Sequence, residues 1–143
     1  MDWLFIPKVS LGPIKFNDSS RDVHKLLGAP SKVDIGENPS SPTITDAYSN
    51  IGLRFMYRGS IIDNKLVCFI VFPGEINVVD KDGTVLFPSG FIDGILHMKF
   101  DEVRIGDVYP YQIQYISHNK GVAMVLNAPE RKYDLFSAHL KIK

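Results

Sequence analysis

Residues 17–30 read N-D-S-S-R-D-V-H-K-L-L-G-A-P, and several local rules agree on a helix in this stretch. Ser19 is followed three residues later by Asp22, which places an acidic side chain against the free amides of a first helical turn. One apolar stripe follows at the spacing i, i+3 and i+4, formed by Val23, Leu26 and Leu27. The stretch therefore predicts an amphipathic helix.

The end of this helix is also marked in the sequence. Gly28 stands where a left-handed C-cap is common, and Pro30 prevents the helix from continuing. We predict one short helix over about residues 19–27, with strands in the remainder of the chain that pack against it.

The composition is that of one globular domain, residues 1–143. Hydrophobic residues make up 45% of the chain, more than a disordered protein would have. Sixteen basic and sixteen acidic residues cancel. Because no net charge remains, the chain as a whole would not attract nucleic acid or an anionic membrane.

Signals for export or membrane insertion are missing. The first ten residues, M-D-W-L-F-I-P-K-V-S, lack the basic region and the apolar run of a signal peptide. The longest apolar run, residues 66–72, is far shorter than the ~20 residues that span a bilayer. We expect a soluble cytoplasmic protein.

Strand patterns dominate the middle and the end of the chain. Residues 53–57 alternate between apolar and polar, and residues 66–72 are apolar on both faces, as in a central strand. The sequences D-K-D-G at 80–83 and H-N-K-G at 118–121 predict two hairpin turns, and the alternation from Tyr133 onward predicts a closing strand.

Two segments are harder to assign. Residues 36–43, G-E-N-P-S-S-P-T, predict a surface loop. Residues 91–100 suit either a helical turn or a strand, and we favour a turn that leads into a strand. The fold class we predict is α+β: a mostly antiparallel β-sheet meander with one short N-terminal helix and room for a second short helix.

Candidate chemistry is sparse. Cys68 lies in the most apolar strand, which predicts a buried and unreactive thiol, and a single cysteine excludes internal disulfides. D-K-D-G at 80–83 resembles the start of a calcium loop but lacks the later ligands. We interpret the four histidines as surface residues because none has ligand spacing: His24, His97, His118 and His139. We therefore predict no catalytic residue, cofactor or metal site.

Tyrosines on one predicted strand form the best candidate surface. Tyr109, Tyr111 and Tyr115 share a face, and we favour the interpretation that this face is half of the core. The alternative is a recognition face, because tyrosine is enriched at interfaces. Arg54 and Arg58 stand beside aromatic residues and join these tyrosines as candidate partner-binding residues; the neutral charge argues against RNA.

Residues 12–33 resemble the strand–turn–helix unit of small BamE-like domains. The family's V-x-x-L-L-G-x-P signature is matched by Val23, Leu26, Leu27, Gly28 and Pro30. Asn17-Asp18 stand where the family usually has a glycine. The pattern D-V…L-G-x-P followed by Y-x-N-x-G-L, at Asp22–Pro30 and Tyr48–Leu53, is also similar to a eukaryotic phagophore-associated adaptor family.

Both resemblances imply a protein-binding module and transfer no catalytic residue. By analogy of type alone, such a small neutral protein resembles bacterial immunity proteins, which neutralise a cognate toxin. We expect a non-enzymatic protein-binding module, most concretely an immunity protein with a toxin as its specific partner. The alternative is a small hydrolase or ligand-binding enzyme whose site is assembled from dispersed polar residues.

Overall fold

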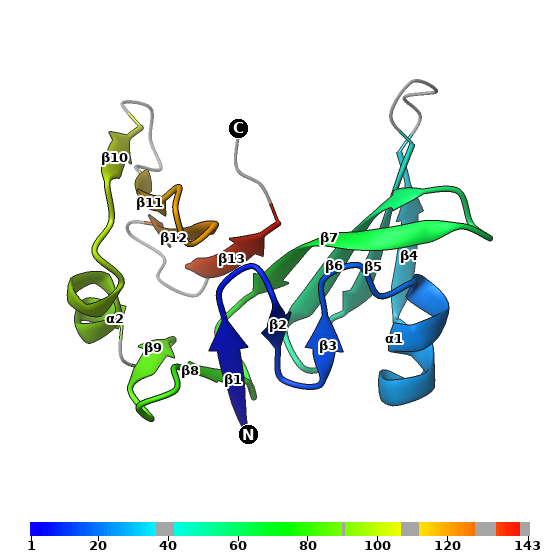
Figure 1. Ribbon diagram of the computed structural model, residues 1–143, viewed down its shortest axis with the longest axis horizontal. Helices are drawn as coiled ribbons and strands as arrows, with labels where there is room; N and C mark the ends of the chain where they lie inside the picture. Colours follow the sequence, from blue (N-terminus) through cyan, green and yellow to red (C-terminus); the bar gives the residue numbers. More distant parts are fainter. Residues whose placement is uncertain (37–41, 90, 107–111, 128–133, 141–143) are drawn as a thin grey trace.

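The computed structural model describes residues 1–36, 42–89, 91–106, 112–127 and 134–140. Within these ranges the regular structure is mostly β, with thirteen strands and two short helices (Figure 1). The strands form two sheets, one of five strands and one of eight among the residues described. The predicted α+β class is therefore wrong, because the helices are two short additions to a β structure.

The smaller sheet joins the start of the chain to its middle. β1 pairs in parallel with β8, with Trp3 opposite Val78, and the other pairings are antiparallel. The strand order is β3 (Ile14–Lys15), β2 (Ser10–Leu11), β1 (Asp2–Ile6), β8 (Asn77–Val79) and β9 (Val85–Phe87). The D-K-D-G turn predicted at 80–83 connects β8 to β9, as expected.

The larger sheet is antiparallel throughout its described strands. β7 is central, as predicted, and β13 is inserted between β12 and β7. The order is β10 (Glu102–Ile105), β11 (Gln112–Ser117), β12 (Val122–Asn127), β13 (Leu135–His139), β7 (Asn64–Val71), β6 (Leu53–Gly59), β5 (Thr43–Tyr48) and β4 (Lys32–Ile35). Strands β4 and β10 form the two edges.

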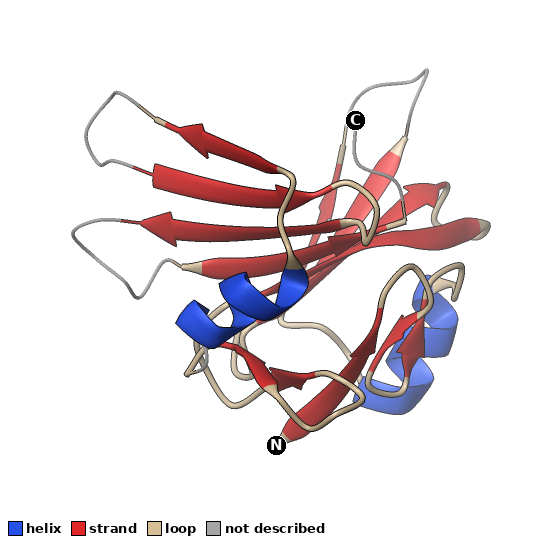
Figure 2. Cartoon of the chain, turned by 60° about the vertical axis from the view of Figure 1, so that its left-hand side comes forward, coloured by secondary structure: helices blue, strands red, loops and turns tan. Residues whose placement is uncertain are grey.

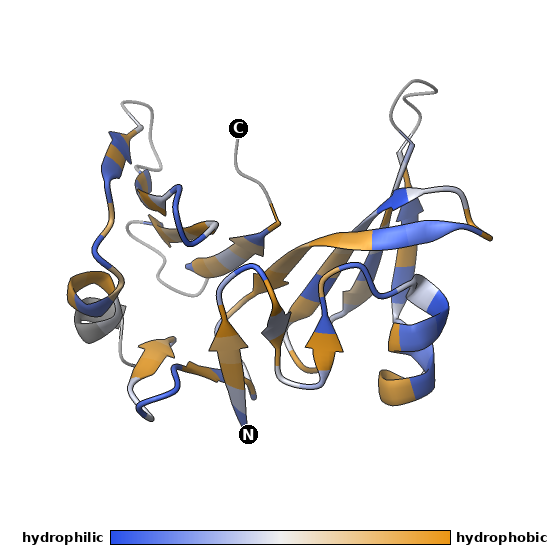
Figure 3. Cartoon of the chain, viewed as in Figure 1, coloured by the Kyte–Doolittle hydropathy of each residue, from blue (hydrophilic) through white to orange (hydrophobic). Residues whose placement is uncertain are grey.

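The core lies between one face of the eight-stranded sheet and a second layer. Figure 2 shows that layer, which consists of the five-stranded sheet and the helices α1 (Ser20–Leu27) and α2 (Phe91–Met98). Phe5 and Phe136 join the two sheets with their rings 5.2 Å apart and edge to face. We call the covered side of the large sheet the inner face and the opposite side the outer face. β1, β3 and β9 are coloured mainly as hydrophobic in Figure 3.

Helix α1 confirms the prediction for residues 19–27. Ser19 is the N-cap, its hydroxyl accepts from the Asp22 amide, and the Asp22 carboxylate accepts from the Ser19 amide in return. Gly28 is the C-cap with φ +82°. Its ψ of −166° places it in a region open essentially to glycine alone, beyond the left-handed helical conformation that we expected.

The buried side of α1 differs from the predicted stripe. Val23 is fully buried and Leu27 packs against the core, but Leu26 is 56% exposed. Ser20 and His24 complete the face that meets the sheet, because each finds a polar partner there: the Ser20 amide donates to Asn64 Oδ1 at 2.7 Å, and His24 contacts Asp46. The predicted stripe was therefore wrong at Leu26, because hydrophobicity alone does not show that polar His24 faces the sheet.

Helix α2 overturns the favoured assignment of residues 91–100 to a turn and a strand. Gly94, which has a low helix propensity, lets this helix lie directly against β9: a Cβ atom there would be 2.4 Å from the Leu86 carbonyl oxygen. A residue that weakens a helix by propensity is thus required by the packing of this one. The core of the predicted loop at 36–43 lies outside the described residues.

Candidate functional site

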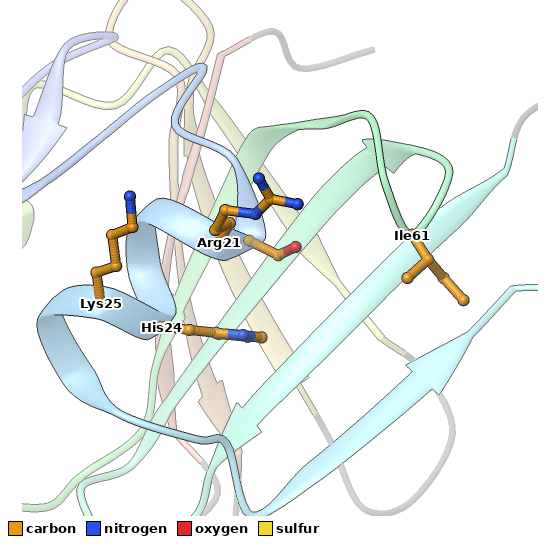
Figure 4. Close-up of a pocket in the computed structure, with 5 residues that line it drawn as sticks. Arg21, His24, Lys25 and Ile61 are labelled. Carbon is orange, nitrogen blue, oxygen red and sulfur yellow. The ribbon is translucent and has the colours of Figure 1, made fainter.

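A pocket opens between α1 and the turn that connects β6 to β7 (Figure 4). It has a volume of about 420 Å³ and is lined by Ser20, Arg21, His24 and Lys25 from the helix and by Ile61 from the turn. In Figure 4 the His24 side chain extends from α1 toward the strands, and Ile61 stands across from it. The helix therefore supplies the polar wall and the turn an apolar one.

A buried carboxylate lies behind the histidine. Asp46 on β5 is 1% exposed, and its Oδ2 atom is 2.6 Å from His24 Nε2. Its Oδ1 atom and the Tyr57 hydroxyl are both buried without a hydrogen bond of ordinary geometry among the described groups. Burial raises the pKa of Tyr57 well above its usual range, and the neighbouring Asp46 charge raises it further. Tyr57 therefore remains protonated.

The edge strand β4 lies next to β5, the strand that carries Asp46. Val33 pairs with Asp46 and Ile35 pairs with Ile44, so both β4 side chains lie on the inner face. They are 50% and 56% exposed, although the inner face is buried along the central strands. We define the α1 groove as the surface formed by Arg21, His24, Lys25, Ile61, Val33 and Ile35.

The opposite edge of the sheet carries a second apolar surface. Val103 and Ile105 on β10 pair with Tyr115 and Ile113, which places them on the inner face as well. Val103 and Ile105 are exposed, and no basic group lines this strand on the same face within the described residues. We define this surface as the β10 edge; it differs from the α1 groove in having no cation on the same face of the strand among the described residues.

The candidate residues from the sequence do not form one surface. Tyr115 is half-buried on the inner face, where its ring lies 5.9 Å from that of Phe100. Arg54 and Arg58 are exposed on the outer face of β6, with Arg54 5.1 Å above the Phe72 ring. Tyr109 and Tyr111 lie outside the described residues. Tyr115 and the two arginines therefore lie on opposite faces of the sheet, with β12, β13 and β7 between their strands.

Three histidines that sequence analysis treated as surface residues contact carboxylates. His24 meets Asp46, His97 meets Asp80, and His118 Nδ1 lies 2.7 Å from Asp101 Oδ1. These partners come from other strands and turns, so no spacing in the sequence indicates them. One signal was present for Asp46, because it stands between Ile44 and Tyr48 on the apolar face of an alternating strand.

Cys68 and His139 share the outer face of the central strands. Cys68 is buried as predicted, and burial raises the pKa of its thiol to about 12. The Sγ atom is 4.0 Å from His139 Nε2, which also lies 2.9 Å from the Ser137 hydroxyl. His139 is only partly exposed, so its assignment to the surface is wrong, and burial lowers its pKa. A thiol that stays protonated is a poor nucleophile.

No known protein family, curated protein or solved structure matches the chain. The resemblance to BamE-like domains therefore stays a prediction that rests on the residues around α1. Neither α1 nor α2 is long and apolar enough to cross a lipid bilayer, and the described part of the chain holds no other helix.

Proposed function

We propose that this protein is a non-enzymatic protein-binding module and that it binds its partner in the α1 groove. The observation that carries the proposal is the exposure of apolar side chains on the inner face beside a cationic helix. Ile61 is 69% exposed and Ile35 56%, and exposed apolar patches rimmed by polar residues commonly mark interaction sites on soluble proteins. Arg21 and Lys25 stand beside them on α1.

The partner that fits this groove presents apolar side chains next to carboxylates. Isoleucine and valine side chains supply the apolar contact, and Arg21 supplies a planar group suited to a carboxylate. Among the described strands, β4 is the edge of the sheet beside the groove, so an extended acidic segment of a partner could also pair with its backbone. The concrete form that we propose is a cytoplasmic immunity protein, with the partner a cognate bacterial toxin.

Affinity capture from the native host, compared across two charge-reversal variants, tests the groove. The groove variant combines Arg21→Glu with Ile61→Asp, and the matched control combines Arg104→Glu with Ile105→Asp at the β10 edge. We expect wild type and control to retain one stoichiometric partner that the groove variant loses, with all three proteins folded by circular dichroism. Loss of the partner in the control alone would move the site to the β10 edge.

The toxin form of the proposal needs a second experiment. The captured partner is expressed in a susceptible bacterium with and without the protein. We expect growth arrest by the partner alone, rescue by wild type and by the control, and failure of rescue by the groove variant. A harmless partner would rule out immunity while leaving the binding module in place.

The enzymatic alternative depends on one observation, the contact between His24 and buried Asp46, which is an arrangement that general bases use. Its neighbour Ser20 is already engaged, because its hydroxyl accepts a hydrogen bond of 3.0 Å from the Asn64 side-chain amide. A hydrolase that uses His24 as its base would lose its activity in His24→Gln while the variant stays folded by circular dichroism.

A further inference from the structure

Three potential metal ligands meet at the β8–β9 hairpin, away from the α1 groove. Asp80 and Asp82 come from the turn of the hairpin, and His97 comes from the last turn of α2. One donor atom from each side chain lies within 4.8 Å of the other two. We propose that Asp80, Asp82 and His97 form a binding site for a divalent transition-metal ion such as Zn²⁺.

The turn holds Asp80 in place for this role. Its Oδ1 atom accepts hydrogen bonds of 2.9 Å from the amides of Asp82 and Thr84. The Asp80 amide donates to the Thr84 carbonyl, which closes the hairpin around the carboxylate. One carboxylate oxygen is therefore used by the turn, and the orientation of the other is set without any ligand.

The second oxygen of Asp80 is turned toward His97. The Asp80 side chain is 12% exposed, and its Oδ2 atom is buried without a hydrogen bond of ordinary geometry to any described group. This atom faces His97 Nε2, with which it is in contact. Carboxylate oxygen and imidazole nitrogen are both zinc ligands, so one ion placed between them would replace their direct contact.

The position of His97 follows from packing and does not depend on attraction to the carboxylates. Gly94 lets α2 lie against the backbone of Leu86 on β9, and Met98 is buried on the same side of the helix. His97 is three residues after Gly94, so it lies on the same helical face one turn later. The imidazole is thereby directed to the hairpin turn, where Asp80 and Asp82 lie.

The donor set decides the class of metal. Zinc binds imidazole nitrogen at about 2.0–2.1 Å and carboxylate oxygen at about 2.0–2.2 Å, so ligand atoms around a tetrahedral ion lie roughly 3.4 Å apart. The three donor atoms lie within 4.8 Å of one another, so side-chain rotations would bring them to this separation around an ion. Calcium and magnesium favour oxygen ligands alone, which disfavours them here. Asp82 and His97 are exposed, so water could complete the coordination sphere.

Asp82 distinguishes a metal site from a simple ion pair between His97 and Asp80. His97 and Asp80 are neighbours whether or not an ion is bound, whereas the Asp82 carboxylate has no side-chain partner among the described residues. Because Asp82 is exposed, Asp82→Asn should leave the folded protein stable. A loss of zinc affinity in this variant therefore reports coordination by its carboxylate.

The experiment is a calorimetric titration of chelator-treated protein with Zn²⁺, together with thermal unfolding in its presence and absence. We expect one ion per chain, a rise in Tm on binding, and affinity weakened roughly tenfold or more in Asp82→Asn and in His97→Gln. The matched control is His118→Gln, which removes an exposed histidine from another contact with a carboxylate and should bind zinc as wild type does.

Three outcomes would overturn the proposal. Wild type could bind no zinc, Asp82→Asn could bind it as tightly as wild type, or His118→Gln could be the variant that loses it. None of these results depends on a partner or on the α1 groove, so the metal site and the proposed function stand or fall separately.

Discussion

The Nε2 atom of His24 on α1 lies 2.6 Å from the Oδ2 atom of Asp46 on β5. This contact joins α1 to the sheet through polar groups, and the fully buried Val23 adds apolar packing. Asn64 makes a second polar contact, to Ser20. The wall of the α1 groove is therefore oriented by specific polar partners in addition to apolar packing.

Removing His24 should destabilise the protein more than removing the charge of Asp46. His24→Ala leaves a buried carboxylate without its partner, at a cost of about 3 kcal/mol or more. Asp46→Asn keeps a hydrogen-bonding side chain and should cost about 1–2 kcal/mol. Urea unfolding of both single variants and the double variant measures the coupling. Costs that add to within about 0.5 kcal/mol would show that the two side chains do not interact.

Substitution of Gly28 should destabilise the protein through backbone strain, without a steric clash of the new side chain. A side chain at this position would meet no atom within 4 Å, but the pair φ +82°, ψ −166° is essentially restricted to glycine. We expect Gly28→Ala and Gly28→Asn each to cost about 1–3 kcal/mol in urea unfolding. Asparagine tolerates the ordinary left-handed conformation, so a Gly28→Asn variant as stable as wild type would contradict the conformation seen here.

His139 should make the protein less stable in mild acid. Burial lowers its pKa below the usual 6.5, so the unfolded chain takes up the proton first. Its contribution is fully present above pH 6.5 and is lost as the pH falls from there through the lower pKa of the folded state. We expect wild type to lose more free energy of unfolding than His139→Gln between pH 7 and pH 5. Equal losses would show that the imidazole is not desolvated.

Truncation of Tyr115 should affect stability and leave partner binding intact. Tyr115 is half-buried against Phe100, so Tyr115→Ala should cost about 1–2 kcal/mol, less than a fully buried ring. Exposed Arg58 provides the comparison, since Arg58→Ala should change stability by at most about 0.5 kcal/mol. β11 and β4 belong to opposite halves of the sheet, so capture of the partner should persist. Loss of capture in a folded Tyr115→Ala protein would favour the tyrosine surface instead.

Features of short range could be predicted from the sequence. The capping box of Ser19 and Asp22, the glycine cap at residue 28 and the turn at 80–83 are local, so neighbouring residues contain all the information they need. Cys68 was correctly expected to be buried because it lies within the uninterrupted apolar run of residues 66–72. Alternation likewise located β6 and β11, because period-two patterns show where one face of a strand is covered.

Features of long range appeared only in the tertiary structure. The α+β prediction failed because strands such as β2 and β3 are two residues long, too short to show a period-two pattern, and because β1 pairs with the distant strand β8. Gly94 has a low helix propensity and so argued against a helix, yet α2 needs a glycine there to approach the backbone of Leu86. The residues of the α1 groove and of the proposed metal site are brought together by strand order and helix packing. The chain alone therefore determined its caps, turns and central strands, and the fold decided which polar side chains meet, because those contacts join residues that no local pattern connects.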